Sequence, residues 1–543
     1  MNTWRVLRTL LTLTAVASPP AIALDINNPP VGTFVDEWYV VRIEGKKSGH
    51  AHITMKRSQK TGDDVITSRT DMVIEISRAG QEAGVRLVQQ SEETIDGKPL
   101  RFMNTIRLGA LPGGITTRGT VADGKVTITT SQFGQETEPR VYPMPEGAMM
   151  SWAVYREQMK RGLKPGDKYE LMAYEPSISA DKVIPMSVEI MEPETIDLFG
   201  RKVQATKTSQ VMHITNMLGQ KSDVETLSWM TDDGNIVRSQ MMVAKWKIEI
   251  LAASKSVALS PNEPTELMTD ALIPVSRPID GRSDRITYRI SLKNKVDRVR
   301  LSDIPETDMQ RVLRRNESEL DLVVTRRTSE GDRPGAKKLG DSPARRLAAK
   351  EKERYLTPSS VVNFKDPTVA DLAKQAAGDE KDPLKLAERL CQFVSDYVED
   401  KNLNVGFATA SETARSKEGD CTEHGVLLAA LGRAVGIPTR LVTGIVYARH
   451  FAGKEGVFVG HLWTQFFIDG RWVDLDSALG QTVADPTHIA LSLSDAGDSG
   501  IADMVSSVWL NMGELKIEVL DGPGRKAISQ PAGLVPASVP TLR

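Results

Sequence analysis

The first half of the chain carries short runs in which apolar and β-branched residues alternate with polar ones, a pattern typical of β-strands. Turn signals such as Asp123-Gly124 and Asp233-Gly234 separate these runs. One helix is expected over 151–161. We therefore predict a large antiparallel β-rich domain over 30–255, built as a curved sheet or partial barrel, followed by a smaller β-containing region over 256–326. The clearest strand runs are 38–43, 51–55, 125–129, 186–190, 285–290 and 320–324.

From residue 355 the pattern changes to helices mixed with strands. Asp382 and Pro383 are a helix cap and a first helical residue, and apolar residues follow at helical spacing up to Val398. Gly436-Ile437-Pro438 ends another helix. The sequence predicts an α+β core over 355–495. Its expected helices are 366–377, 383–398 and 421–435, and its expected strands are 439–447, 461–468 and 471–475.

The remaining segments differ in composition. Residues 326–354 contain ten Lys or Arg, five Asp or Glu, and several Gly and Pro. This composition favours a solvated linker over 327–354. A basic binding patch is the alternative, which the interspersed acids disfavour. Residues 496–543 are assigned as a C-terminal extension.

The first 23 residues have the pattern of a secretory signal peptide. Arg5 and Arg8 precede a short apolar run over 10–17, and Ala21-Ile22-Ala23 fits the small-x-small cleavage pattern. An uncleaved membrane anchor is the alternative, but the apolar run is short for a bilayer span. We expect a secreted or periplasmic protein with no transmembrane segment after cleavage.

Composition excludes some classes of function and leaves others open. The formal net charge of −2, with 26% charged residues, does not favour a nucleic-acid-binding protein. Only two cysteines occur among 543 residues, so this is not a disulfide scaffold. Cys391 lies on or beside the apolar face of a predicted helix, which favours a buried free thiol. A disulfide between Cys391 and Cys421 would remove the free thiol of Cys421.

Cys421 has the position of a reactive cysteine. It begins a predicted helix whose later residues are apolar nearly all round, so the helix is expected to be buried. The N-terminus of a helix offers unpaired N–H groups and a positive dipole, which favour a thiolate and could hold an oxyanion. Asp420 can cap this helix, but its charge opposes thiolate formation, so a cationic partner is needed.

The hairpin around Asp469-Gly470 predicts that partner. A two-residue turn places Ile468 opposite Arg471, and in the same register Trp463 opposite Asp476. Asp476 is then the diagonal neighbour of His461 on the same face of the hairpin, whereas Asp474 lies one pair further away. The register therefore favours Asp476 over Asp474 as the carboxylate that orients His461.

The other histidines are weaker candidates. His424, three residues after Cys421, could reach the thiol but has no evident orienting carboxylate. His50, His52 and His213 are expected to be ordinary strand or turn residues. We expect His450 and His488 in loops, with His488 near the site. No cluster has the ligand spacing of a metal site, and we predict neither a metal nor a cofactor.

Four stretches together resemble the core of the transglutaminase-like superfamily, a papain-like group that includes microbial cysteine peptidases. The resemblance covers about 355–495 and implies Cys421 as nucleophile, His461 as general base and acid, and Asp476 as orienting residue. Protein-crosslinking members have a tryptophan where this chain has Thr422, and no calcium-site pattern is visible, so crosslinking is not implied. The stretches are 419–421, 427–440, 460–463 and 470–476.

Cys, His and Asp together predict a thiol-dependent enzyme that acts on amide bonds. We expect hydrolysis, as in a protease or amidase, or transfer to an amine, as in a transglutaminase. The expected substrate is an extracytoplasmic protein or peptide, for example of the cell envelope. The alternative is a catalytically silent scaffold whose β-rich domain binds a ligand or partner.

Overall fold

The structure is a computed structural model. It describes residues 24–60, 63–78, 81–108, 114–132, 135–136, 138–176, 179–215, 221–243, 246–266, 269–275, 277–293, 301–316, 318–326, 347–403, 408–497 and 512–521. The predicted signal peptide, 1–23, lies outside the described residues. Two compact units divide near residue 267, and we call them unit 1 and unit 2.

Unit 1 is a single large sheet. Its strands follow the order β10-β11-β12-β13-β14-β15-β1-β2-β3-β4-β5-β6-β7-β8, with β9 beside β7 and β16 beside β3. All neighbours for which a register is defined pair antiparallel except β16, which is parallel to β3. The elements are β1 (Gly32–Ile43), β2 (Lys46–Lys60), β3 (Asp63–Arg78), β4 (Gln81–Thr94), β5 (Pro99–Leu108), β6 (Ile115–Ala122), β7 (Lys125–Gln132), β8 (Gln135–Glu136), β9 (Arg140–Pro143), α2 (Ser151–Arg161), β10 (Lys168–Ala173), β11 (Ile184–Leu198), β12 (Arg201–Thr215), β13 (Lys221–Met230), β14 (Ile236–Val243), β15 (Trp246–Ala253), α3 (Lys255–Ala258) and β16 (Thr265–Glu266).

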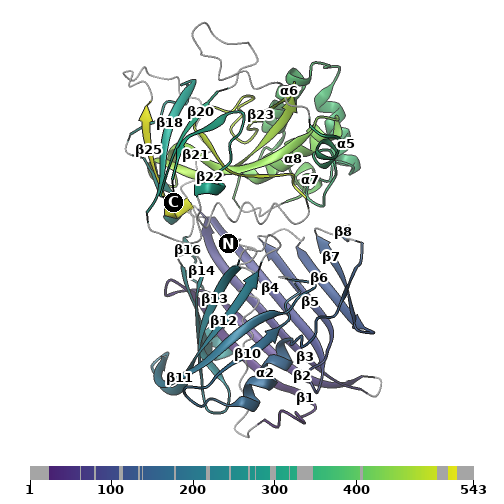
Figure 1. Cartoon of the computed structure of the whole chain (residues 1–543), viewed down its shortest axis with the longest axis vertical. Coiled ribbons are helices and arrows are strands. Elements are labelled where there is room, and N and C mark those ends of the chain that lie inside the picture. Colours follow the sequence, from purple (N-terminus) through teal and green to yellow (C-terminus); the bar gives the residue numbers. More distant parts are fainter. Residues whose placement is uncertain are drawn as a thin grey trace. The chain divides into compact units, whose positions relative to one another are not determined.

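Helix α2 packs against distant parts of this sheet. Val154 lies in a cluster with apolar residues of β10 to β13. Met150, just before the helix, lies in another cluster with Phe102 of β5 and Val126 of β7. Because the two ends of the strand order both reach the same helix, the sheet curves around α2 (Figure 1).

Unit 2 contains two sheets and a group of helices. The first sheet has the order β17-β22-β21-β24, with β23 beside β22, and the second has the order β19-β20-β18-β25. The elements are η1 (Thr269–Ala271), β17 (Ile273–Pro274), β18 (Arg285–Leu292), η2 (Leu301–Asp303), β19 (Gln310–Arg315), β20 (Glu319–Thr325), α4 (Ala349–Arg354), α5 (Pro367–Ala377), α6 (Pro383–Tyr397), α7 (Ala410–Ser416), α8 (Cys421–Ala434), β21 (Thr439–Phe451), β22 (Lys454–Ile468), β23 (Arg471–Leu475), β24 (His488–Ser494), η3 (Met512–Glu514) and β25 (Leu515–Asp521).

The two sheets of unit 2 share one apolar core. Tyr288 of β18 meets Phe458 of β22 edge-on, with ring centroids 5.8 Å apart. Ile445 of β21 and Ile489 of β24 belong to the same buried cluster. The helices α5 to α8 gather on the other side of β21 and β22 (Figure 1). Helix α8 lies among the other helices and these strands, so the residues from Thr422 to Arg433 are all buried.

This architecture confirms the predicted fold class, an α+β core preceded by a large antiparallel β-rich domain. Of the predicted linker 327–354, residues 327–346 lie outside the described residues, and 349–354 form the exposed helix α4. In the predicted extension 496–543, β25 pairs with β18, and 498–511 and 522–543 are outside the described residues. Where the chain is described, no helix has the length and apolar character needed to cross a bilayer.

Candidate active site

Helix α8 begins at Cys421 because the residues before it form a complete cap. The Asp420 carboxylate accepts the Thr422 backbone N–H at 2.8 Å, and the Glu423 carboxylate accepts the Asp420 backbone N–H at 2.9 Å. Gly419 has φ +151°, and a Cβ there would lie 2.3 Å from the Glu423 Cβ. A glycine before the cap therefore fixes where the helix starts and where Cys421 lies.

Glu423 is buried and also holds the loop that precedes α7. Its carboxylate accepts the Ala408 backbone N–H at 2.9 Å. Burial raises the pKa of Glu423 well above its usual range, and the nearby Asp420 charge raises it further. Glu423 therefore takes up a proton more readily than an exposed glutamate does.

Cys421 is a free, partly exposed thiol at the first position of the helix. Burial of its sulfur raises the pKa of the Cys421 thiol well above its usual range, and the Asp420 charge acts in the same direction. A hydrogen bond from the Leu462 backbone amide lowers it by less. The resting sulfur is thus a thiol, and it lies against the peptide that follows His461.

Helix α8 can approach β22 closely because a glycine faces the strand. A Cβ on Gly425 would lie 2.2 Å from Leu462 Cδ2, an overlap that real structures do not show. The Thr464 hydroxyl donates to the Gly425 carbonyl at 2.9 Å. These contacts bring the first turn of α8 beside the segment of β22 that carries His461.

The hairpin of β22 and β23 has the register predicted from the Asp-Gly turn. Ile468 pairs with Arg471, and Thr464 pairs with Leu475. Asp476, the next residue, places its carboxylate Oδ2 2.7 Å from His461 Nε2. Both side chains are buried, with 7% of His461 and 1% of Asp476 exposed.

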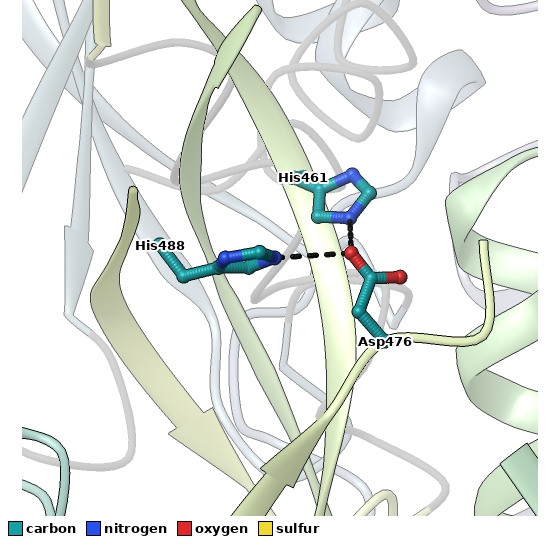
Figure 2. A group of neighbouring side chains, drawn as sticks. All are labelled: His461, Asp476 and His488. Atoms are coloured by element: carbon teal, nitrogen blue, oxygen red, sulfur yellow. Dashed lines mark hydrogen bonds and ion pairs between the residues drawn. The ribbon is translucent and has the colours of Figure 1, made fainter. Parts of the chain in front are cut away.

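The Asp476 carboxylate is fully occupied by donors. Its Oδ1 accepts the backbone N–H groups of Ala478 at 2.9 Å and Leu479 at 3.2 Å. Its Oδ2 faces Nε2 of both His461 and His488, and Figure 2 shows the two imidazoles converging on this oxygen. Burial alone would raise the pKa of Asp476, but the two histidines hold it far below its usual range.

This contact fixes the tautomer of His461. Asp476 is a carboxylate and can only accept, so His461 donates from Nε2. A neutral His461 then has its lone pair on Nδ1, which makes Nδ1 the atom that can take a proton. The arrangement is that of a base whose outer nitrogen is held by a carboxylate.

Asp474 is also buried but serves other side chains. Its Oδ1 accepts the Trp463 indole N–H and the Gln465 amide N–H, each at 2.8 Å. Burial raises the pKa of Asp474, and these hydrogen bonds offset the effect only in part. Asp474 therefore fixes Trp463, whose ring is stacked 6.2 Å from that of His461. As the register predicted, Asp476 and not Asp474 contacts the imidazole.

The prediction that His488 lies in a loop is wrong. His488 is the first residue of β24, pairs with Val446 of β21, and is only 1% exposed. Its Nε2 lies 3.0 Å from Asp476 Oδ2. The sequence did hold a signal, since Ile489 to Ser494 continue with strand character directly after the Asp485-Pro486 turn.

His424 lies next to the site without joining the Cys421 contacts. Its Nδ1 donates to the Asp420 carbonyl at 2.7 Å, and its buried Nε2 has no hydrogen-bond partner. Burial lowers the pKa of His424 to about 4, so its ring is neutral at neutral pH. His50, His52 and His213 lie in β2 and β12, as ordinary strand residues. His450 was predicted in a loop but lies in β21, where it pairs with Glu455.

Cys391 is a buried free thiol, as predicted. It lies in the middle of α6 and donates to the Gln481 carbonyl at 3.5 Å. Burial raises the pKa of the Cys391 thiol far above its usual range. Cys391 is inaccessible to a substrate, whereas Cys421 is partly exposed.

His461, Asp476 and His488 are the described residues that could hold a metal ion, since their ligand atoms lie within 4.8 Å of one another. However, their N···O separations of 2.7 and 3.0 Å are hydrogen-bond lengths, and Asp476 Oδ2 is the shared acceptor. A hydrogen-bonded network accounts for the arrangement of all three residues.

Part of the chain matches a known protein family. Residues 370–477 match the Transglutaminase-like superfamily. The chain contains a transglutaminase-like domain. This finding confirms the family resemblance inferred from the motifs around Cys421, His461 and Asp476. No curated protein matches the sequence.

Two solved structures illustrate more distant similarities. A "putative cysteine protease" from Cytophaga hutchinsonii is 15% identical, with 46% of this chain and 93% of that chain covered and a TM-score of 0.28. A β-barrel-like protein of a domain of unknown function from Brucella abortus is 11% identical, with 41% of this chain and 96% of that chain covered and a TM-score of 0.29.

Proposed function

We propose that this protein catalyses thiol-dependent acyl transfer or hydrolysis at amide bonds of an extracytoplasmic protein or peptide. Cys421 is the nucleophile, His461 the general base and acid, and Asp476 the residue that orients His461. The observation that carries the proposal is the His461–Asp476 contact of 2.7 Å, because it leaves Nδ1 as the basic nitrogen. The Cys421 sulfur lies at the adjoining Leu462 amide.

The first half of the reaction forms a thioester. Cys421 Sγ attacks the carbonyl carbon of the amide while its proton moves to His461 Nδ1. The carbonyl oxygen becomes an oxyanion, and the Cys421 backbone N–H, at the first position of α8, stabilises it. The C–N bond then breaks as His461 returns the proton to the leaving amine.

The second half releases the acyl group. Water or an amine attacks the thioester carbon and gives its proton to His461. The C–S bond breaks, and the thiol is restored with that proton. Water yields a carboxylic acid, as from a protease or amidase, whereas an amine yields a new amide, as from a transglutaminase.

The surroundings of Cys421 oppose ionisation of the thiol before substrate binds. Burial raises the pKa of Cys421, and Asp420 raises it further, so the resting site holds a thiol. A substrate carbonyl at the helix N-terminus accepts the electron pair of the sulfur while the proton moves to His461, so no free thiolate has to form first. This supports a general-base mechanism rather than a preformed ion pair.

The reaction can be tested with peptides and proteins from the cell envelope, incubated with a fluorescent primary amine. The wild type should generate products that mass spectrometry identifies as new carboxylic acids or amine-labelled chains. Cys421→Ala should generate neither. Cys391→Ala is the matched control, since it removes the other cysteine, which is buried in α6, and it should retain activity.

The same experiment distinguishes the catalytic proposal from a silent scaffold. Identical products from wild type and Cys421→Ala would contradict catalysis by this thiol. The ratio of acid to amine-labelled product identifies the acyl acceptor that the enzyme prefers.

A further inference from the structure

His488 is held between acceptors on both sides of its ring. Its Nε2 lies 3.0 Å from Asp476 Oδ2. Its Nδ1 lies 3.1 Å from the Asp485 carbonyl oxygen and 3.3 Å from Asp485 Oδ1. None of these oxygens can donate while the carboxyls are ionised.

This environment determines the protonation of His488. A neutral imidazole has one bare nitrogen, and in this position that lone pair would face an oxygen lone pair in a buried site. Protonation of both nitrogens removes the repulsion and satisfies both contacts. The hydrogen-bond geometry alone therefore calls for an imidazolium.

Asp485 is itself held in place. Its Oδ1 accepts the Thr487 backbone N–H at 2.9 Å, and its Oδ2 accepts the Gln481 side-chain amide at 3.1 Å. Gln481 in turn forms two backbone hydrogen bonds with Asp476. The loop between β23 and β24 thus joins both carboxylates into one structure with His488 between them.

We propose that His488 is a positioning residue: held as an imidazolium between Asp476 and Asp485, it keeps the Asp476 carboxylate charged and directed at His461. The inference rests on the proposed function, since it assigns His488 a task in the action of His461. Asp485 is the second carboxylate that contacts His488, and its negative charge balances the positive charge of the imidazolium.

The charges around His488 come from several elements. Asp476 follows β23, and Asp485 precedes β24. From β22, His461 has its ring centroid 5.9 Å from that of His488, and the Trp463 ring meets His488 edge-on at 5.1 Å. Asp474 of β23 is near enough for the charge of His488 to lower its pKa. From β18, the Tyr288 hydroxyl donates to the Pro486 carbonyl.

With His488 protonated, Asp476, His488 and Asp485 carry a total charge of −1, the same as a single carboxylate. Without that proton they carry −2. When His488 is protonated, its charge opposes a positive charge on His461. When His488 is neutral, the total charge of −2 favours a positive charge on His461. His488 thereby helps His461 to stay neutral until it takes the proton of the thiol.

The electrostatics agree with this assignment. Burial alone would lower the pKa of His488, but the hydrogen bonds to Asp476 and Asp485 raise it to about 10. Burial alone would raise the pKa of Asp485, but His488 lowers it to about 2. All three groups therefore keep their charges through the neutral range.

The first test reads the protonation of His488 directly in the wild-type full chain. With ¹⁵N-labelled histidine, the ring nitrogens of the seven histidines can be assigned by single substitutions. We expect both nitrogens of His488 to be protonated at pH 7.5 and at pH 8.5. A bare nitrogen on His488 at pH 7.5 would overturn the inference, whatever the enzyme does.

The second test reads the effect on Cys421 through the pH dependence of its alkylation by iodoacetamide. His488→Gln keeps a donor to Asp476 but removes the positive charge. The acid limb of the pH–rate profile, where the alkylation rate of Cys421 rises with pH, should therefore move to higher pH by about one unit. His488→Gln combined with Asp485→Asn restores the total charge of −1 and should return the limb to the wild-type position. His450→Gln, on an exposed ion pair, is the control.

A purely structural His488 predicts other results. If His488 were purely structural, His488→Gln would lose stability without a shift of the acid limb. The double variant would then not bring the acid limb back to the wild-type position. Either outcome overturns the inference. Equal alkylation of wild type and His461→Ala would instead contradict the proposed function, and it would leave the spectroscopic result on His488 unchanged.

Discussion

Two buried carboxylates, one in each unit, show what decides the charge of a carboxyl group inside this protein. Glu93 of β4 accepts the Trp152 and Ala153 backbone N–H groups at 2.8 and 2.9 Å and the Ser91 hydroxyl at 2.9 Å. Asp476 likewise accepts two backbone N–H groups. Both carboxylates are essentially inaccessible, with 0% of Glu93 and 1% of Asp476 exposed.

Their pKa values nevertheless shift in opposite directions. Burial raises the pKa of Glu93 to about 7, although its hydrogen bonds oppose the shift. Burial also acts to raise the pKa of Asp476, but His461 and His488 lower it to below its usual range. Two backbone donors alone do not keep a buried carboxyl ionised, whereas adjacent imidazoles do. Glu93 caps the start of α2, while Asp476 is suited to hold a histidine that takes up protons.

The largest effect should follow from removing the charge of Asp476. Asp476→Asn leaves both histidines facing an amide, so we expect Cys421 alkylation at pH 7.5 to fall about 100-fold. Loss of one partner from a buried charged cluster should also cost about 3 kcal/mol or more in the free energy of unfolding. Glu93→Gln is the contrasting variant in unit 1, and it should leave the alkylation rate unchanged.

The two units should also lose stability in different pH ranges. The raised pKa of His488, about 10 in the folded protein against an ordinary 6.5, gives unit 2 stability that is complete below about pH 6.5 and lost as the pH rises toward 10. Hydrogen exchange of peptides from β22 and β24, corrected for intrinsic rates, should accelerate between pH 7 and 9.5. An unchanged protection of these peptides would contradict a buried imidazolium.

Unit 1 should respond at lower pH. Glu93 is protonated more readily in the folded protein, with a pKa of about 7 against an ordinary 4.5, so stability is complete below about pH 4.5 and is lost as the pH rises to 7. The shift corresponds to about 3 kcal/mol. Protection of peptides from β4 and α2 should fall over this range, and Glu93→Gln should flatten the dependence.

The smallest effect is expected from Asp474→Asn. An asparagine can still accept from Trp463 and Gln465, and the carboxylate it replaces already has a raised pKa because it is buried. We expect alkylation of Cys421 to change less than about tenfold. A loss as large as that of Asp476→Asn would show that the two carboxylates do not have separate roles.

Local signals in the sequence predicted much of unit 2. Asp382, followed by Pro383, caps α6 as expected, and the predicted helix from Asp366 is α5, which Asp366 caps. The Asp469-Gly470 turn fixed the register that brings Asp476 to His461. Helix α7 was missed, although Thr409 and Glu412 form the capping box that marks its start. Its seven residues are too few to show a helical period.

The features that the sequence did not predict depend on contacts between separate elements of the chain. In unit 1, β1 pairs with β15, about 200 residues further along the chain, and nothing in the alternation of single strands encodes that pairing. His488 was placed in a loop because its partners, Val446 in β21 and Asp476 after β23, are distant in sequence. Its charge depends on two carboxylates that only the folded chain brings together.

The central claim is that His461 activates the thiol of Cys421. It is tested most directly by the rate of Cys421 alkylation with iodoacetamide at pH 7.5, followed by peptide mass spectrometry in wild type and His461→Ala. Because burial raises the pKa of this thiol, we expect the rate to fall about 100-fold in His461→Ala and to stay unchanged in His450→Ala. Equal rates in wild type and His461→Ala would contradict it.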